Sequence, residues 1–180
     1  MPCLIAFLCL LAPLSAAELF RDDFTRFAPG LLSAPMGQLN GAIQEYHYLP
    51  HRGVPTVPWR NPIAHYDGWS AGDEDGKPYV EQHLVHDQPQ RFQPLFVTGD
   101  PLWTSYTVSA RVKPLSFAEM AGIVFRYRTN RHYYLFSLSG GNRARLALRL
   151  PIEKTFRNID YRELGSAEIK YDTTRYYQFR

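Results

Sequence analysis

Tyr106-Thr-Val-Ser-Ala-Arg-Val-Lys113 belongs to the stretch that decides the fold, which runs from Leu102 to Leu150. Its apolar and polar residues alternate, so one set of side chains faces a core and the other faces water. Three further segments have strand-like composition, and turn residues separate them: Gly122–Arg128, Tyr133–Leu138 and Arg143–Leu150. We therefore predict four consecutive antiparallel strands in an all-β protein.

The alternation also predicts which side chains are buried. In the first and fourth strands, the apolar positions should face the core and the arginines should face water. The buried set is then Tyr106, Val108, Ala110, Val112, Ala144, Leu146, Leu148 and Leu150, and the exposed set includes Arg111, Arg145 and Arg149. Between the third and fourth strands, Ser139-Gly-Gly-Asn142 has the composition of a tight turn.

The N-terminus predicts export. Leu4 to Leu14 is an apolar run that is too short to span a bilayer. Ser15 and Ala17 place small residues three and one before Glu18, as signal peptidase requires. We predict a signal peptide over residues 1–17, a secreted or periplasmic bacterial protein, and no transmembrane segment after cleavage.

Composition narrows the class of protein. Cys3 and Cys9 are the only cysteines and lie within the predicted signal peptide, so the exported chain would form no disulfide. The formal net charge is +3 and no basic stripe is present, which argues against nucleic acid as a partner. Aromatic residues make up 14% of the chain, which suits a β-rich extracellular domain.

A single domain is expected over residues 18–180, in two unequal parts. Leu19–Phe24 has the pattern of a short first strand. Residues 28–94 are rich in Pro, Gly, His and Trp and show only weak strand patterns, such as 79–85. A loop-rich segment of that length is uncommon and often functional, so we interpret it as an insertion that decorates the sheet.

The segments Leu19–Phe24, Trp103–Val112, Ala121–Tyr127 and Tyr133–Phe136 together resemble the concanavalin A-like lectin/glucanase superfamily. Within it, the closest resemblance is to laminin-G-like domains of bacterial carbohydrate-active proteins, including 3-keto-disaccharide hydrolases. The resemblance covers the first strand and residues 95–180, and implies an antiparallel jelly-roll β-sandwich. More strands follow in that fold, so we predict a sandwich that continues beyond Arg180.

Saccharide binding is the function that these residue types favour. Trp59 and Trp69 lie in the insertion, where their rings could stack on a sugar. On the sheet, Arg126 and Arg128 lie close in sequence to Tyr133 and could bind the carboxylate of an acidic poly- or oligosaccharide. The alternative is that the aromatic residues pack in the core and the arginines are solvated.

One acidic motif suggests a metal ion. Asp73-Glu74-Asp75-Gly76 gathers carboxylates on a bending segment, and hard cations prefer such clustered oxygens. Since related sandwiches often hold a structural calcium ion, calcium at Asp73 and Asp75 is one interpretation. A solvated acidic turn is the other. No other cofactor is predicted.

The sequence contains no complete catalytic motif. The glucanase branch carries Glu-x-Asp-x-x-Glu on a strand, and this pattern does not occur here. Ser-His-Asp and Cys-His arrangements have no support either. Our preferred interpretation is a carbohydrate-binding module at the N-terminal end of a larger polysaccharide-degrading enzyme. Two alternatives remain: the sandwich is itself a glycoside hydrolase or polysaccharide lyase, or it is a structural or adhesion domain.

Overall fold

The computed structural model describes residues 17–32, 54–56, 58–61, 69–83, 94–118, 120–129, 132–150 and 161–180. The predicted signal peptide, residues 1–17, thus falls outside the described residues except for Ala17. Across the described ranges the protein is all-β, and its strands pair antiparallel. None of these ranges contains a helix long and apolar enough to cross a membrane.

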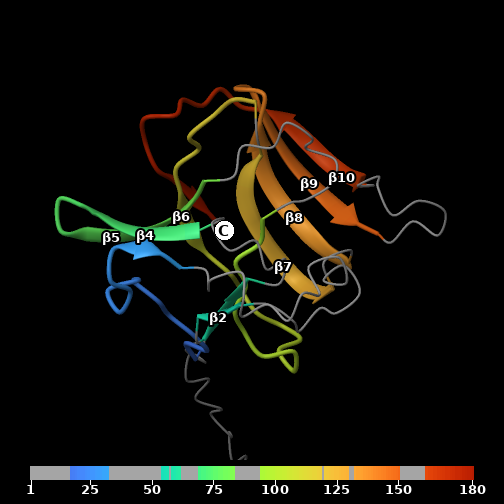
Figure 1. The fold of residues 1–180 in the computed structure, drawn as a ribbon. Coiled ribbons are helices and arrows are strands. Elements are labelled where there is room, and N and C mark those ends of the chain that lie inside the picture. Colours follow the sequence, from blue (N-terminus) through green and yellow to red (C-terminus); the bar gives the residue numbers. More distant parts are fainter. Residues whose placement is uncertain are drawn as a thin grey trace, which may run out of the picture.

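The largest sheet has the strand order β10-β9-β8-β7, formed by β7 (Ala121–Thr129), β8 (His132–Ser139), β9 (Arg143–Arg149) and β10 (Tyr161–Glu168). A second sheet has the order β1-β4-β5, formed by β1 (Gly30–Leu31), β4 (Trp69–Glu74) and β5 (Lys77–Gln82). Two further pairs are β6 (Ala110–Val112) with β11 (Tyr177–Phe179), and β2 (Val54–Thr56) with β3 (Trp59–Asn61). Figure 1 shows the large sheet as a curved surface, with the β4–β5 hairpin projecting away from it.

Strands β7, β8 and β9 confirm the second, third and fourth strands predicted from the sequence. The β8–β9 turn is also confirmed, since Gly140 and Gly141 adopt φ values of 63° and 77° that favour glycine. In the first predicted strand, only Ala110–Val112 is extended and paired. Tyr106 is 37% exposed rather than buried. Its hydroxyl accepts a hydrogen bond of 2.9 Å from the backbone N–H of Arg126, where β7 bulges.

The strand predicted at Leu19–Phe24 is not formed. Carboxylates of two neighbouring aspartates bind the backbone there: Asp22 accepts from the N–H of Phe24 at 2.9 Å, and Asp23 accepts from the N–H of Thr25 at 3.1 Å. Such side-chain-to-backbone bonds turn the chain and compete with a strand ladder. Phe24 accordingly has a φ of 64°.

One face of the large sheet packs against the β6–β11 pair. We call it the Phe136 face. Leu138 is buried there against Phe179 and Tyr171, and the rings of Phe136 and Phe179 lie 5.3 Å apart. Val112 of β6 joins the same cluster. This contact buries apolar side chains from two sets of strands that are distant in sequence, and so forms one hydrophobic core of the fold.

The opposite face carries polar side chains among its buried residues. We call it the Tyr133 face. It includes Tyr133, Leu135 and Ser137 on β8, Arg143, Arg145, Ala147 and Arg149 on β9, and Tyr161, Glu163 and Ser166 on β10. Tyr133 and Ser137 are fully buried, and Leu95 packs against Tyr133 and Leu135.

The burial predicted for β9 is therefore wrong in part. Arg149 is only 5% exposed and Ala147 is fully buried, whereas Leu146 and Leu148 are half-buried. Arg145 is half-buried too, while Arg111 of β6 is exposed as predicted. The reason is that other side chains pack on both faces of β9: Ala144 joins the cluster around Phe179 on one face, and Met120 and Tyr161 contact Arg145 on the other. The guanidinium of Arg149 is held by Tyr133, whose hydroxyl accepts its hydrogen bond at 3.1 Å.

Gly122 of β7 tests how tightly β7 and β8 are packed. A Cβ atom at this position would lie 2.2 Å from the carbonyl oxygen of Phe136 and 2.8 Å from the Cα of Ser137. Since these are backbone atoms, Gly122→Ala should lower the free energy of unfolding by at least about 2 kcal/mol, measured by urea denaturation. Gly165→Ala is the control, because a Cβ there meets nothing within 4 Å and should change stability by less than about 0.5 kcal/mol. Equal stability losses in the two variants would contradict this packing.

Burial on the Tyr133 face should also appear in an alkaline titration. Loss of hydration raises the pKa of Tyr127 and of Tyr161, and the nearby Tyr133 adds to both shifts. When the pKa of a phenol is higher in the folded than in the unfolded protein, its contribution to stability is complete below the unfolded pKa of about 10. That contribution is lost as the pH rises from this value toward the folded pKa. We expect the 295 nm absorbance of these tyrosines to rise only with unfolding. Tyr127→Phe should remove one late-ionising group, and ordinary ionisation of every tyrosine near pH 10 in folded protein would contradict the prediction.

Candidate functional site

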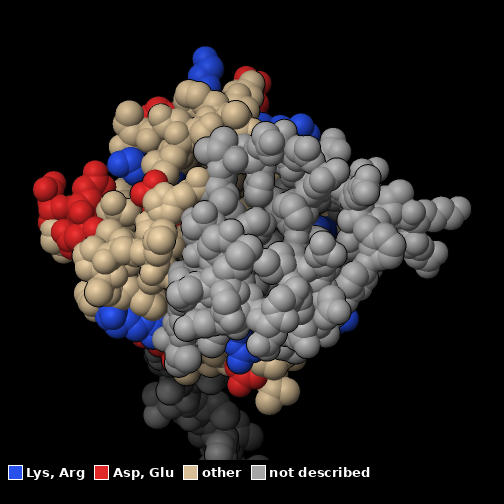
Figure 2. Space-filling view, viewed as in Figure 1, with Lys and Arg blue, Asp and Glu red and all other residues tan. Residues whose placement is uncertain are grey.

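The β4–β5 hairpin forms one side of the candidate site. Glu74 pairs with Lys77 across the hairpin end, and Asp75 and Gly76 form the turn with φ values of 55° and 72°. An Asp-Gly pair with two positive φ angles is what a two-residue hairpin turn favours. Asp73 accepts a hydrogen bond of 2.6 Å from the N–H of Gly76, which fixes the turn. In Figure 2, acidic side chains gather at the tip of this hairpin.

The β6–β11 pair forms the opposite side. Val112 pairs with Tyr177, and both join the core on the Phe136 face. Because side chains alternate along a strand, Arg111 and Lys113 point away from this core. Tyr176 precedes Tyr177 and lies on the same outer side as these two cations. Its ring centre lies 4.9 Å from the Arg111 guanidinium carbon and 5.6 Å from the Lys113 ammonium.

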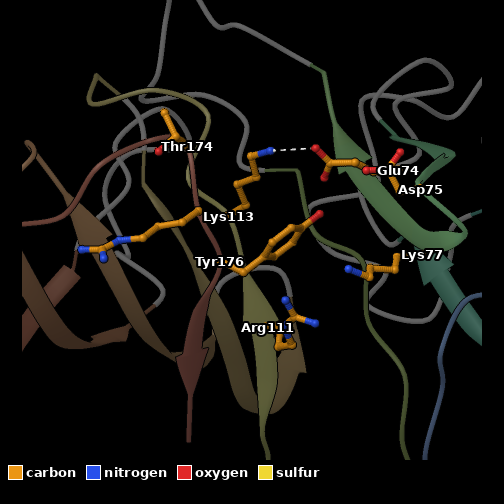
Figure 3. Close-up of a pocket in the computed structure, with 8 residues that line it drawn as sticks. Glu74, Asp75, Lys77, Arg111, Lys113, Thr174 and Tyr176 are labelled. Atoms are coloured by element: carbon orange, nitrogen blue, oxygen red, sulfur yellow. Dashed lines mark hydrogen bonds and ion pairs between the residues drawn. The ribbon is translucent and has the colours of Figure 1, made fainter.

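A pocket of about 390 Å³ lies between the hairpin and the β6–β11 pair, and we call it the Tyr176 pocket. Its volume falls within the range of about 300–1,000 Å³ that is usual for ligand sites. The residues that line it are Glu74, Asp75, Lys77, Arg111, Lys113, Thr174, Arg175 and Tyr176. Figure 3 shows the Tyr176 ring between the side chains of Arg111 in β6 and Lys113 just after β6, with its hydroxyl directed toward the hairpin.

The pocket has more positive than negative charge. Four of its side chains are cationic and two are carboxylates. Lys113 forms an ion pair of 3.4 Å with Glu74. Within the described part of the chain, neither Arg111 nor Lys77 forms an ion pair with a carboxylate, although Arg111 lies against the Tyr176 ring. An anionic group in the pocket would therefore meet cations that no carboxylate of the described residues neutralises.

Asp172 fixes the segment that leads into β11. It accepts hydrogen bonds from the backbone N–H and the hydroxyl of Thr174, at 2.9 and 2.7 Å. Arg175 forms an ion pair with Asp172 at 3.0 Å. The Thr174 bonds and the Arg175 charge hold the pKa of Asp172 below its ordinary value, so this carboxylate is ionised at neutral pH. The rim of the Tyr176 pocket is thus built by hydrogen bonds local to residues 172–177.

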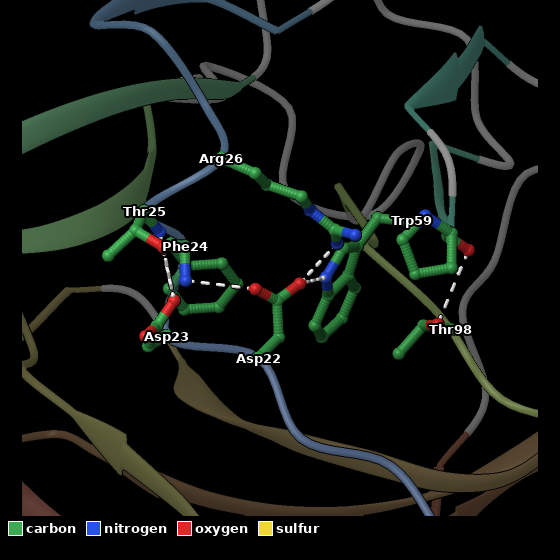
Figure 4. Close-up of polar contacts among 8 residues, drawn as sticks. Asp22, Asp23, Phe24, Thr25, Arg26, Trp59 and Thr98 are labelled. Carbon is green, nitrogen blue, oxygen red and sulfur yellow. Dashed lines mark hydrogen bonds and ion pairs between the residues drawn. The ribbon is translucent and has the colours of Figure 1, made fainter.

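The two tryptophans predicted as a stacking platform lie elsewhere, in an aromatic cluster around Phe96. The Trp59 ring stacks on Phe96 at 4.9 Å with an interplanar angle of 2°, and Trp69 lies 5.3 Å from Phe96. Figure 4 shows the indole Nε1 of Trp59 donating to the Asp22 carboxylate, which also binds Arg26. The cluster joins the N-terminal segment to β3 and β4. Its rings contact one another, and their contact with a saccharide stays a prediction.

The sheet residues predicted for an acidic sugar are not brought together. Tyr133 is fully buried, whereas Arg126 and Arg128 of β7 are exposed. Arg126 lies at the bulge with a φ of 49°, and its guanidinium donates to the carbonyl oxygen of Thr104 at 3.3 Å. The arginines that do lie beside Tyr133 and Tyr161 are Arg149 and Arg145.

Asp73 and Asp75, the predicted calcium ligands, both lie at the exposed end of the β4–β5 hairpin. Asp73 is engaged in the turn, and Asp75 lines the Tyr176 pocket. The described residues contain no group of three or more His, Cys, Asp or Glu side chains placed to hold a metal ion. Calcium binding at this turn stays a prediction.

Sequence reasoning missed the Tyr176 pocket because its residues come from three separate segments. Arg111 and Lys113 were recognisable as outward-facing positions of an alternating strand, and Tyr176 as part of a strand-like end. Their meeting depends on the pairing of β11 with β6, which no local pattern specifies. The one sequence feature that pointed to this site was the pair of cationic residues Arg111 and Lys113, two positions apart in an alternating strand pattern.

Comparison with known proteins adds no relative: no protein-family model, curated protein or solved structure matches this chain.

The aromatic cluster makes a stability prediction. Trp59→Phe removes a hydrogen bond to the Asp22 side chain, whereas Trp69→Phe removes an indole N–H that is buried without a hydrogen-bond partner. We expect Trp59→Phe to lose roughly 1–2 kcal/mol more unfolding free energy than Trp69→Phe, because a hydrogen bond to a charged group contributes more than an unpaired donor. Chemical denaturation of both variants measures the difference. A larger loss in Trp69→Phe would show that the Asp22 contact is not what holds the cluster.

Proposed function

We propose that this protein is an exported carbohydrate-binding β-sandwich module of the concanavalin A-like type, and that it belongs to a larger polysaccharide-degrading enzyme. The all-β antiparallel fold is compatible with that type, and export rests on the apolar run at residues 4–14 with Ser15 and Ala17 after it. The saccharide-binding role rests on the Tyr176 pocket.

The observation that carries the proposal is the chemistry of that pocket. Its volume suits a small ligand, and its lining offers a phenol hydroxyl, two guanidinium groups and two ammonium groups. These are hydrogen-bond donors of the kind that meet sugar hydroxyls and carboxylates. Because Arg111 and Lys113 lie against the Tyr176 ring, they are held in place before a ligand arrives. We therefore expect an acidic poly- or oligosaccharide rather than a neutral one.

Binding is favoured over catalysis by the carboxylates of the pocket. Glu74 is paired with Lys113, and Asp75 lies at the hairpin turn. A retaining glycosidase needs two carboxylates on one face about 5 Å apart, and an inverting one needs them about 6.5–9.5 Å apart around a water. With Glu74 engaged by Lys113, the pocket is better suited to holding a saccharide than to cleaving one.

Variants of the pocket test the proposal. Arg111→Gln and Tyr176→Ala should each weaken binding of acidic oligosaccharides about tenfold, equivalent to about 1.4 kcal/mol, in calorimetric titrations. Added salt should weaken binding by the parent protein as well, because the attraction is between charges. Arg162→Gln, an equal charge change at an exposed position of β10 outside the pocket, is the control and should bind like the parent.

Two outcomes would contradict the proposal. The first is equal binding by the parent, Arg111→Gln and Tyr176→Ala, with melting temperatures unchanged. The second is no binding across an array of neutral and acidic glycans, which would leave a structural or adhesion role. Release of shortened or unsaturated products from a polysaccharide by the parent protein would make the domain a hydrolase or lyase instead.

A further inference from the structure

The Tyr133 face holds a buried positive charge that forms no ion pair with any carboxylate of the described residues. Arg149 is 5% exposed, and it donates a hydrogen bond to the Tyr133 hydroxyl and lies 5.6 Å from the centre of that ring. These partners are neutral. Burying a charge without a partner of opposite charge is strongly unfavourable, so this face is suited to receive an anion.

Two more polar atoms on the same face have no partner. Ser137 of β8 and Arg145 of β9 are directly opposite each other in the antiparallel register, so their side chains are neighbours. The Ser137 Oγ and the Arg145 Nε are both buried, and neither has a hydrogen-bond partner among the described residues. A buried polar group left in this state destabilises the fold unless something absent from the chain satisfies it.

The Arg145 side chain is held in place even though its Nε has no hydrogen-bond partner among the described residues. The Arg145 guanidinium carbon lies 5.3 Å from the centre of the Tyr161 ring, and one terminal nitrogen lies 3.3 Å from the sulfur of Met120. Sulfur is a weak acceptor and the ring is neutral, so neither contact neutralises the guanidinium. The negative charge that interacts with Arg145 on this face is the carboxylate of Glu163, which forms an ion pair with Arg143. The result is an immobilised cation with one open donor beside an open hydroxyl.

We propose that Ser137 and Arg145 form a binding position for one carboxylate group, with Arg149 contributing positive potential on the same face. A carboxylate has two oxygens, which match two neighbouring donors, and Arg binds this group with favourable geometry. A sulfate or phosphate ester would leave a third oxygen unmatched. Arg145 and Tyr161, which border this position, are half-buried, and Arg143 on the same face is exposed.

This position is separate from the Tyr176 pocket and shares no residue with it. A carboxylate of this kind occurs on a uronic acid unit of a saccharide and on a small free acid. Both sources present the same chemistry to Ser137 and Arg145. A uronate oligomer is larger than a free acid such as acetate or citrate, and it can be compared with a neutral oligosaccharide of equal length. Titrations with these three kinds of ligand therefore separate the two sources.

The experiment titrates the full chain with galacturonate and glucuronate oligomers, their neutral galactose and glucose counterparts of equal length, and acetate and citrate. Ser137→Ala is the decisive variant, because it deletes an unpaired buried hydroxyl and should fold with an unchanged or higher melting temperature. We expect its affinity for the carboxylate ligand to fall about tenfold, and Arg145→Gln to abolish binding at this position. Arg162→Gln, on the Phe136 side of β10, is the charge-matched control and should bind like the parent.

The outcomes separate this proposal from the proposed function. Uronate binding that weakens about tenfold in Ser137→Ala and is unchanged in Tyr176→Ala supports the carboxylate position on a saccharide. The same pattern with acetate or citrate alone supports a small free acid. Binding that responds only to Tyr176→Ala overturns the carboxylate position and leaves the proposed function standing. Loss of stability in Ser137→Ala, with uronates and free acids bound as in the parent, would mean that water alone satisfies the two atoms, and this overturns the proposal as well.

Discussion

The pairing of β8 with both β7 and β9 is the constraint on which the other features depend. It places β8 and β9 inside a sheet with a strand on either side, and residues from other segments pack on both faces of that sheet. One face packs Phe136 and Leu138 against Phe179 and Tyr171. The other buries Tyr133, Ser137 and Arg149. The β6–β11 pair, and with it the Tyr176 pocket, is positioned by its contact with the first of these faces.

The local part of this arrangement could be predicted from the sequence. The alternating patterns and the Gly140-Gly141 turn located β7, β8 and β9 to within one residue at each end. These signals are short-range, because a strand and a tight turn depend on a few adjacent residues. The faces of β9 could not be predicted in the same way. Alternation says which side chains share a face, but it does not say whether the polar face meets water, and here Arg149 does not.

The candidate site was beyond sequence reasoning for a related reason. Lys113 and Tyr176 meet because β11 pairs with β6, across more than sixty residues of chain. The N-terminal segment shows the same limit. Leu19–Phe24 has the composition of a strand, yet Asp22 binds the backbone of Phe24 and the indole of Trp59 instead. The bond from the Phe24 N–H to the Asp22 carboxylate replaces a backbone hydrogen bond that a strand would need. The second partner, Trp59, is distant in sequence and could not be predicted from local residues.

The contrast between the two faces of β8 and β9 argues that the polar one serves a function. The same two strands, in the same register, supply an apolar layer from Phe136, Leu138 and Ala144 on one side. The fold can therefore build such a layer from these strands. Replacing buried charged and polar groups by apolar residues of similar volume is often neutral or stabilising. On the other side Arg149 donates to Tyr133, whereas the Ser137 Oγ and the Arg145 Nε have no hydrogen-bond partner among the described residues, and the proposed carboxylate would supply one.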